Sequence, residues 1–156
     1  MTEESLEAVL EASEKILTQS AQLAFEHKEP HVKERVFSSH DVSTLVGISG
    51  DQEGTIIICF AYETAIQVAG RFMEVVGAEP ATDFTDEASS ALAELVNTIM
   101  GHYMIAMEAR GFKVNITPVT VVTGDRVNFG VDGIKRVVAV PVALSGGPAE
   151  INIAMK

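Results

Sequence analysis

The stretch SSALAELVNTIMGHYMIAMEARG, residues 89–111, predicts one long amphipathic helix, because leucine, valine, isoleucine and methionine recur in it at helical spacing. Two residues near its middle are poor helix formers. In a helix interior, Asn97 and Gly101 each cost up to roughly 1 kcal/mol relative to alanine. Their presence raises the question of what they contribute that alanine would not.

The ends of this helix are marked in the sequence. We expect Thr85 to be the N-cap, with Asp86 and Glu87 placed favourably in the first turn of the helix dipole. Gly111 is expected to be the C-terminal cap, since glycine readily adopts the left-handed conformation that ends many helices. The predicted helix therefore runs from just after Thr85 to just before Gly111.

The two faces of this helix differ in composition. At roughly 100° per residue, an apolar arc that must face the core contains Ala88, Ala91, Leu92, Leu95, Val96, Ile99, Tyr103 and Met107. The opposite stripe contains Ser90, Glu94, Asn97, Gly101 and Glu108. Because Gly101 lacks a side chain, a partner's backbone could approach closely beside Glu94 and Asn97. We interpret the stripe as a docking surface, against the alternative of an ordinary solvated face.

The rest of the chain predicts an α+β fold in a single domain covering residues 1–156. Helices are expected at 3–26 and 63–76, and extended structure at 35–48 and 55–62 around a turn at 49–54. After the long helix, strands are expected at 114–122, 127–131, 134–144 and 149–155. Hairpin-length turns separate these strands, so the sheet should be mainly antiparallel, with three helices packed against it.

Composition narrows the possible functions. The 156 residues are 47% hydrophobic, which is enough for a core, and a net charge of -11 argues against nucleic acid as a partner. The acidic N-terminal segment does not match a signal peptide, and no apolar run approaches the roughly 20 residues that span a membrane. We therefore expect a cytoplasmic protein without a membrane partner. Cys59 is the sole cysteine, which excludes an internal disulfide and a cysteine-cluster metal site; we expect it to be buried.

A more specific signal lies in the run Ser90-x-x-x-Glu94-x-x-Asn97, followed roughly twenty residues on by Pro118. This run resembles the signature of the CheC/CheX/FliY chemotaxis phosphatases: Asp or Ser, three residues, Glu, two residues, Asn, and a later proline. The stretches at 40–73 and 134–156 resemble the strands, helix and terminal hairpin of CheX-type members. The resemblance runs from about residue 30 to the end and implies a CheC-like fold.

The resemblance also implies a chemistry. Family members dephosphorylate the response regulator CheY, whose phosphoryl group sits on an aspartate beside Mg²⁺. Glu94 would pair with a lysine of the regulator's active site, and Asn97 would orient the water that attacks phosphorus, as a glutamine does in GTPases. Ser90 and Gly101 would belong to the partner-binding surface. The Mg²⁺ would belong to the partner, so this chain would need no metal or other cofactor of its own.

Two departures from the family pattern are relevant. The segment at 3–26 contains no Glu-x-x-Asn, so the chain has one candidate site where CheC-type relatives have two, and CheX is the better match. The position after Gly101 is often asparagine in the family, and here it is His102, which we interpret as a partly packed structural residue rather than a general base.

Further expectations and alternatives remain at this stage. The resemblance implies a homodimer, and the β-rich stretch 136–144 would present an aggregation-prone edge if it were left unpaired. In an alternative to the enzyme, the fold serves as a non-catalytic module that binds a response regulator, chemoreceptor or flagellar-switch component. A small-ligand sensor ranks last, because no glycine-rich phosphate loop or ligand cluster supports it.

Overall fold

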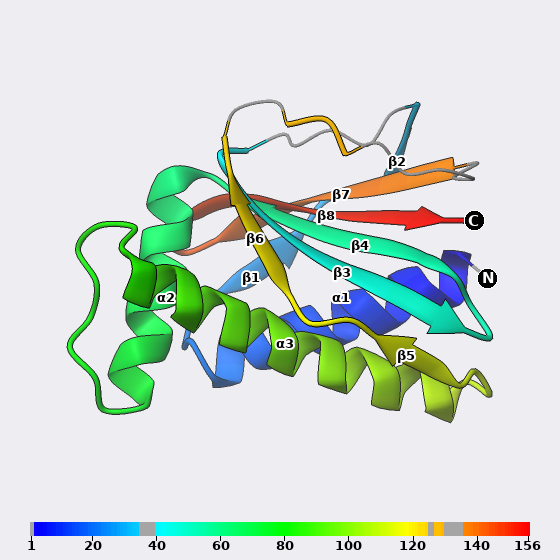
Figure 1. The fold of residues 1–156 in the computed structure, drawn as a ribbon, viewed down its shortest axis with the longest axis horizontal. Coiled ribbons are helices and arrows are strands. Elements are labelled where there is room, and N and C mark those ends of the chain that lie inside the picture. The colour runs from blue at the N-terminus through cyan, green and yellow to red at the C-terminus, as the bar shows by residue number, and fades with distance from the viewer. Residues whose placement is uncertain (1, 35–39, 125–126, 130–135) are drawn as a thin grey trace.

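The computed structural model describes residues 2–34, 40–124, 127–129 and 136–156, which form an α+β fold (Figure 1). The described helices are α1 (Thr2–Gln19), α2 (Tyr62–Val75) and α3 (Asp86–Ala109). The described strands are β1 (Phe25–His27), β2 (His31–Lys33), β3 (Val42–Gly50), β4 (Gly54–Phe60), β5 (Val114–Ile116), β6 (Thr120–Thr123), β7 (Arg136–Leu144) and β8 (Gly147–Met155). The predicted fold class, an antiparallel sheet with three helices packed against it, is confirmed.

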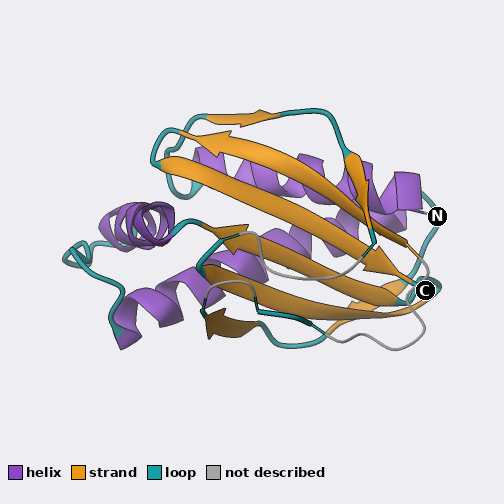
Figure 2. Ribbon diagram, turned by 90° about the horizontal axis from the view of Figure 1, so that it is seen from above, coloured by secondary structure: helices purple, strands orange, loops and turns teal. Residues whose placement is uncertain are grey.

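All described strand pairs are antiparallel and form one sheet in the order β1-β7-β8-β4-β3-β5. Strand β2 also pairs with β7, and β6 also pairs with β3. The predicted turn at 49–54 joins β3 to β4, and a two-residue turn joins β7 to β8, where Leu144 is opposite Gly147. Helices α1 and α3 lie side by side on one face of this sheet, and α2 stands at its end (Figure 2).

The central strand β4 is buried on both of its faces. Ile56, Ile58 and Phe60 belong to the core beneath the helices, whereas Ile57 and Cys59 belong to a smaller cluster on the opposite face. This alternation follows from the two-residue period of a strand. It explains why the sequence reads as the continuous apolar run IIICF, and it confirms the prediction that Cys59 is buried.

The first helix is shorter than predicted. It ends at Gln19 instead of residue 26, and Gln22 adopts a positive φ of 53° that turns the chain away from the helix. Ala21 and Leu23 are still buried, so the apolar pattern continued past the point where the helical backbone stopped. Strands β1 and β2, which the sequence did not predict, follow this turn and pair with β7.

The predicted strand at 114–122 is interrupted. It consists of β5 and β6, which both pair with β3, and the described ladders leave out the residues between them, Thr117 to Val119, although Thr117 still hydrogen-bonds to Gly47 of β3. Pro118 lies in this interruption, where its missing N–H removes a ladder donor. The predicted strand at 127–131 falls partly outside the described residues, as do parts of the stretches at 35–48 and 134–144; of residues 127–129, Asn128 forms a single bridge.

Strand β7 is not an edge of the sheet. It pairs with β8 along one side and with β1 and β2 along the other. The stretch 136–144 is therefore not left unpaired, and the described strands do not need a second subunit to cover it. The short strands β1 and β2 protect this edge from within the same chain.

Candidate functional site

Helix α3 is fixed at both ends as predicted. The Ala88 N–H donates to the Thr85 side-chain oxygen at 3.2 Å, so Thr85 is the N-cap. At the other end, Arg110 is the formal C-cap and Gly111 follows it with a φ of +89°. The N–H groups of Gly111 and Phe112 donate to carbonyls of the last turn at 3.0 Å each, which is the Schellman arrangement.

The inner face of α3 is buried as its periodicity predicted. Leu92, Leu95 and Ile99 have no exposed surface, and Ala91 is the half-buried member of the predicted arc. Tyr103 is also buried, and its hydroxyl lies 3.1 Å from the Ser5 hydroxyl of α1. Burial raises the pKa of Tyr103, so this group stays protonated and can hold the hydrogen bond between the two helices. The outward face of α3 is therefore backed by a packed inner face.

The outer face of α3 presents Ser90, Glu94 and Asn97 to solvent, with Gly101 half-buried on the same stripe. Within the described chain, no side chain forms an ion pair or hydrogen bond with the Glu94 carboxylate or the Asn97 amide. The Thr98 hydroxyl donates to the Glu94 backbone carbonyl at 3.0 Å, and not to the Glu94 carboxylate. Both polar groups are thus available to a partner.

Glu94 stands between two shallow hollows. One, of about 470 Å³, is lined by Ala93, Glu94, Asn97, Ile116, Thr117, Pro118 and Val119. The other, of about 440 Å³, is lined by Asp86, Glu87, Ser90, Ala91 and Glu94. Pro118 is distant from Asn97 in sequence, yet the fold brings both to the same hollow. All the residues of the sequence signature, Ser90, Glu94, Asn97 and Pro118, line this pair of hollows.

The segment carrying Pro118 is held in place by β3. The Thr117 N–H donates to the Gly47 carbonyl at 3.0 Å, and the Gly47 N–H donates to the Thr117 side-chain oxygen at 2.8 Å. A Cβ on Gly47 would lie 3.0 Å from the Thr117 methyl group, so glycine permits this close approach. Sequence reasoning missed Thr117 and Gly47, because only the pairing of β3 with β5 and β6 reveals that they meet.

This arrangement suits recognition of a cation and a water molecule. Neighbours three residues apart on a helix have Cβ atoms about 5–6 Å apart, so Glu94 and Asn97 can contact one ligand together. The carboxylate can accept from an ammonium group, and the amide can both donate to and accept from a water. His102 is half-buried and lines neither hollow, in keeping with the structural role expected of it.

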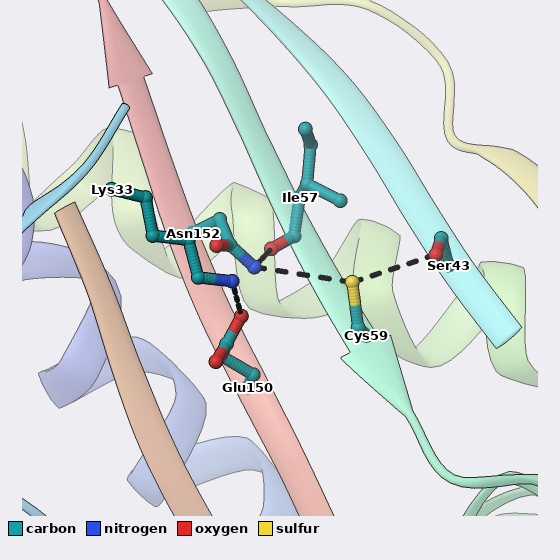
Figure 3. A network of polar contacts seen from close by, with 6 residues as sticks. All are labelled: Lys33, Ser43, Ile57, Cys59, Glu150 and Asn152. Atoms are coloured by element: carbon teal, nitrogen blue, oxygen red, sulfur yellow. Dashed lines mark hydrogen bonds and ion pairs between the residues drawn. The ribbon is translucent and has the colours of Figure 1, made fainter. Parts of the chain in front are cut away.

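A second polar cluster lies on the sheet face opposite the helices (Figure 3). Lys33 of β2 forms an ion pair with Glu150 of β8. The Asn152 amide nitrogen lies 3.9 Å from the Cys59 sulfur, which lies 3.4 Å from the Ser43 hydroxyl. These contacts connect four strands and are separated from Glu94 and Asn97 by the sheet. We therefore assign the cluster a structural role.

Two further properties bear on function. In the ranges that the structure describes, no cluster of three or more His, Cys, Asp or Glu side chains has the arrangement needed to hold a metal ion. Among those same residues, none of the helices is both long enough and apolar enough to span a bilayer. The candidate site itself is the surface of α3 and the β5–β6 connection around the two hollows.

Comparisons with known proteins agree on one family. The family described as "Chemotaxis phosphatase CheX" matches residues 42–143. A relative named CheY-P phosphatase CheX, from Thermotoga maritima, is 38% identical over 85 residues, which are 54% of this chain and 53% of that protein. The matched region thus spans about half of that curated relative.

Solved structures share the architecture along the whole chain. The CheX–CheY–BeF3–Mg²⁺ complex from Borrelia burgdorferi contains a chain that is 31% identical, with a TM-score of 0.77 and 97% coverage of both chains. The chemotaxis protein CheX from Desulfovibrio desulfuricans has a TM-score of 0.86 at 23% identity, covering 98% of this chain and 99% of that one. The second likeness concerns the fold alone.

Proposed function

Because this chain belongs to the chemotaxis phosphatase CheX family, we propose that it hydrolyses the aspartyl phosphate of a CheY-like response regulator. Water attacks phosphorus in line, and a new phosphorus–oxygen bond forms as the bond to the aspartyl oxygen breaks. The products are inorganic phosphate and the regulator's free aspartate. The Mg²⁺ that neutralises charge on the phosphoryl group belongs to the regulator, as the Mg²⁺ in the Borrelia CheX–CheY complex suggests.

Glu94 and Asn97 divide the work in this proposal. Glu94 pairs with a lysine of the regulator and so fixes the orientation in which the two proteins meet. Asn97 enters the regulator's active site and holds the attacking water, since an uncharged amide does not repel the phosphoryl group. Ser90 and Gly101 border the contact. This chain supplies positioning, and it needs no general base of its own.

The observation that carries the proposal is the exposure of Glu94 and Asn97 beside Pro118. A carboxylate and an amide on one helix face are common, but here neither has a partner among the described side chains. The hollow next to them is open and is bordered by the other residues of the family signature. A helix face that only contacts solvent gives no reason for Pro118, distant in sequence, to line the hollow beside Glu94 and Asn97.

The test is the rate of phosphate release from a phosphorylated CheY-like regulator with Mg²⁺, comparing the wild-type protein with Asn97→Ala. Wild type should accelerate release, and Asn97→Ala should lose at least about 100-fold in kcat, as for loss of one transition-state donor. Binding of Asn97→Ala to the regulator should be largely retained. If wild type accelerates no regulator of its host, the chain is instead a non-catalytic interaction module.

We also propose that the protein is cytoplasmic, as its sequence composition suggests, and that it forms a homodimer, as the family resemblance implies. The exposed edges of the described sheet are the short strands β1, β2, β5 and β6, so a second subunit would not need to pair with β7. Light scattering at micromolar concentration should give twice the chain mass of 16.7 kDa. A monomeric mass would contradict the proposed homodimer but not the proposed phosphatase activity.

A further inference from the structure

Two residues on the outer face of α3 are left unexplained by the fold. Gly101 lies in the helix interior, and a Cβ added there would meet nothing within 4 Å, so packing does not require glycine. One turn later, Ile105 is 63% exposed, although it belongs to a helix with a large buried face. A better helix former at 101 would suit a solvated surface, and Ile105 adds one large exposed apolar side chain to the same stripe.

Both residues lie on the ridge that carries Glu94. At 100° per residue, Ile105 points within about 20° of the direction of Glu94, three turns further along the helix. The axial separation is roughly 16 Å from Glu94 and roughly 12 Å from Asn97, at 1.5 Å per residue. Gly101 leaves a gap between Asn97 and Ile105, so a broad surface that covers the glycine also reaches both of these neighbours.

We infer that the regulator's contact surface continues along α3 from Asn97 over Gly101 to Ile105, and that an apolar patch of the regulator packs on Ile105. This inference rests on the proposed function. A standard protein interface buries about 800 Å² on each partner, equivalent to a disc with a radius of about 16 Å. An interface centred on Asn97 therefore reaches Ile105. The Glu94–Asn97 pair alone covers a single helical turn and is too small for stable docking.

Charge and geometry favour the regulator over a second copy of this chain as the occupant. The ridge is acidic at the end where it continues past Ser90 to Asp86 and Glu87, and the exposed Glu108 lies beyond Ile105 at its other end. A second copy has a net charge of -11 and would bring like charge to that acidic end. It would also cover Glu94 and Asn97, which must be free to reach the phosphoryl group.

The test compares Ile105→Ala and Ile105→Asp with Val76→Asp, a matched control at the end of α2 that is also 63% exposed. For hydrolysis of the phosphorylated regulator, Ile105→Ala should raise KM about tenfold, the loss of one good apolar contact, and Ile105→Asp should raise it further. The kcat of both variants should stay within about twofold of wild type, because Asn97 is untouched. Val76→Asp should leave KM unchanged.

Affinity for the regulator bound to beryllofluoride and Mg²⁺ should weaken by the same factors, and light scattering should show an unchanged mass. If the Ile105 variants hydrolyse with wild-type KM while Asn97→Ala is inactive, the extended contact is wrong and the proposed function stands. If Ile105→Asp changes the oligomeric mass, Ile105 contacts a second copy and the inference is overturned. If the wild-type protein does not hydrolyse the phosphorylated regulator, the proposed function is wrong, and the inference that depends on it fails as well.

Discussion

Helices α1 and α3 lie on the same face of the sheet, pack against each other and bury similar apolar arcs, yet their outward faces differ. The outward face of α1 consists mostly of charged helix formers, and its Glu7 and Glu11 lie 3.9 Å and 3.0 Å from the guanidinium of Arg110, the C-cap of α3. The sequence of α1 contains no glycine and no asparagine. The outward face of α3 contains both, together with an exposed isoleucine.

Under the proposed function, the outward face of α1 is solvated and the outward face of α3 binds another protein. A solvated face gains from good helix formers and from paired charges, and α1 has both. Asn97 and Gly101 together give up roughly 1–2 kcal/mol of helix propensity relative to alanine. The Glu94 carboxylate lies on the same helix face and forms no ion pair with any described side chain. Under the proposed function, these departures serve recognition of the regulator.

The largest expected effect comes from the inner face of α3. Leu95→Ala removes a side chain with no exposed surface and should lower the free energy of unfolding by about 2–5 kcal/mol, because a cavity remains. Urea denaturation followed by circular dichroism measures this change. The kcat per folded molecule should stay close to wild type. If Leu95→Ala keeps the wild-type free energy of unfolding, Leu95 does not belong to a buried face of α3.

The second-largest effect is expected from truncating Glu94, the outward-facing neighbour of Leu95. Glu94→Ala should reduce kcat/KM by about 100-fold, since truncating one member of an interfacial charge pair costs roughly 2–5 kcal/mol. Stability should change by less than about 0.5 kcal/mol, because the Glu94 side chain is exposed. Steady-state phosphate release and urea denaturation check the two parts separately. Wild-type kcat/KM in Glu94→Ala would exclude Glu94 from the contact with the regulator.

A smaller effect is expected at Gly101, which leaves a gap in the row of side chains between Glu94 and Ile105. Gly101→Leu should raise KM about tenfold by placing a bulky side chain where the regulator approaches, and it should stabilise the fold by up to about 1 kcal/mol through helix propensity. No internal clash is expected, because the space around a Cβ at this position is open. The combination of a higher melting temperature with weaker binding distinguishes a docking site from a structural glycine. Unchanged KM would mean that the regulator does not cover Gly101.

Much of this organisation could be predicted from the sequence, because it depends on local physics. The ends of α3 followed from Thr85 and Gly111, and its buried arc followed from the 3.6-residue period. The exposure of Glu94 and Asn97 followed from the same projection. The helix face is a property of one segment, so a single stretch of sequence contains the information needed to predict it.

What failed depends on contacts between distant segments. The first helix was extended too far because Ala21 and Leu23 continue the apolar pattern, although Gln22 has already left the helix. Strands β1 and β2 are short and mostly exposed, so their pairing with β7 gives no periodic signal. The approach of Thr117 to Gly47 is likewise a consequence of strand pairing. Those contacts place Pro118 at the hollow and cannot be inferred from spacing.

The smallest expected effect tests the solvated side of the comparison. The double substitution Glu7→Gln and Glu11→Gln removes the charges that face Arg110 but keeps side-chain size. Because both glutamates are largely exposed, the loss of stability should be at most about 1 kcal/mol, and added salt should reduce it further. The kcat and KM should both stay within about twofold of wild type. A tenfold change in KM would mean that the regulator also contacts α1, and the contrast between the two helices would then mark two parts of one interface.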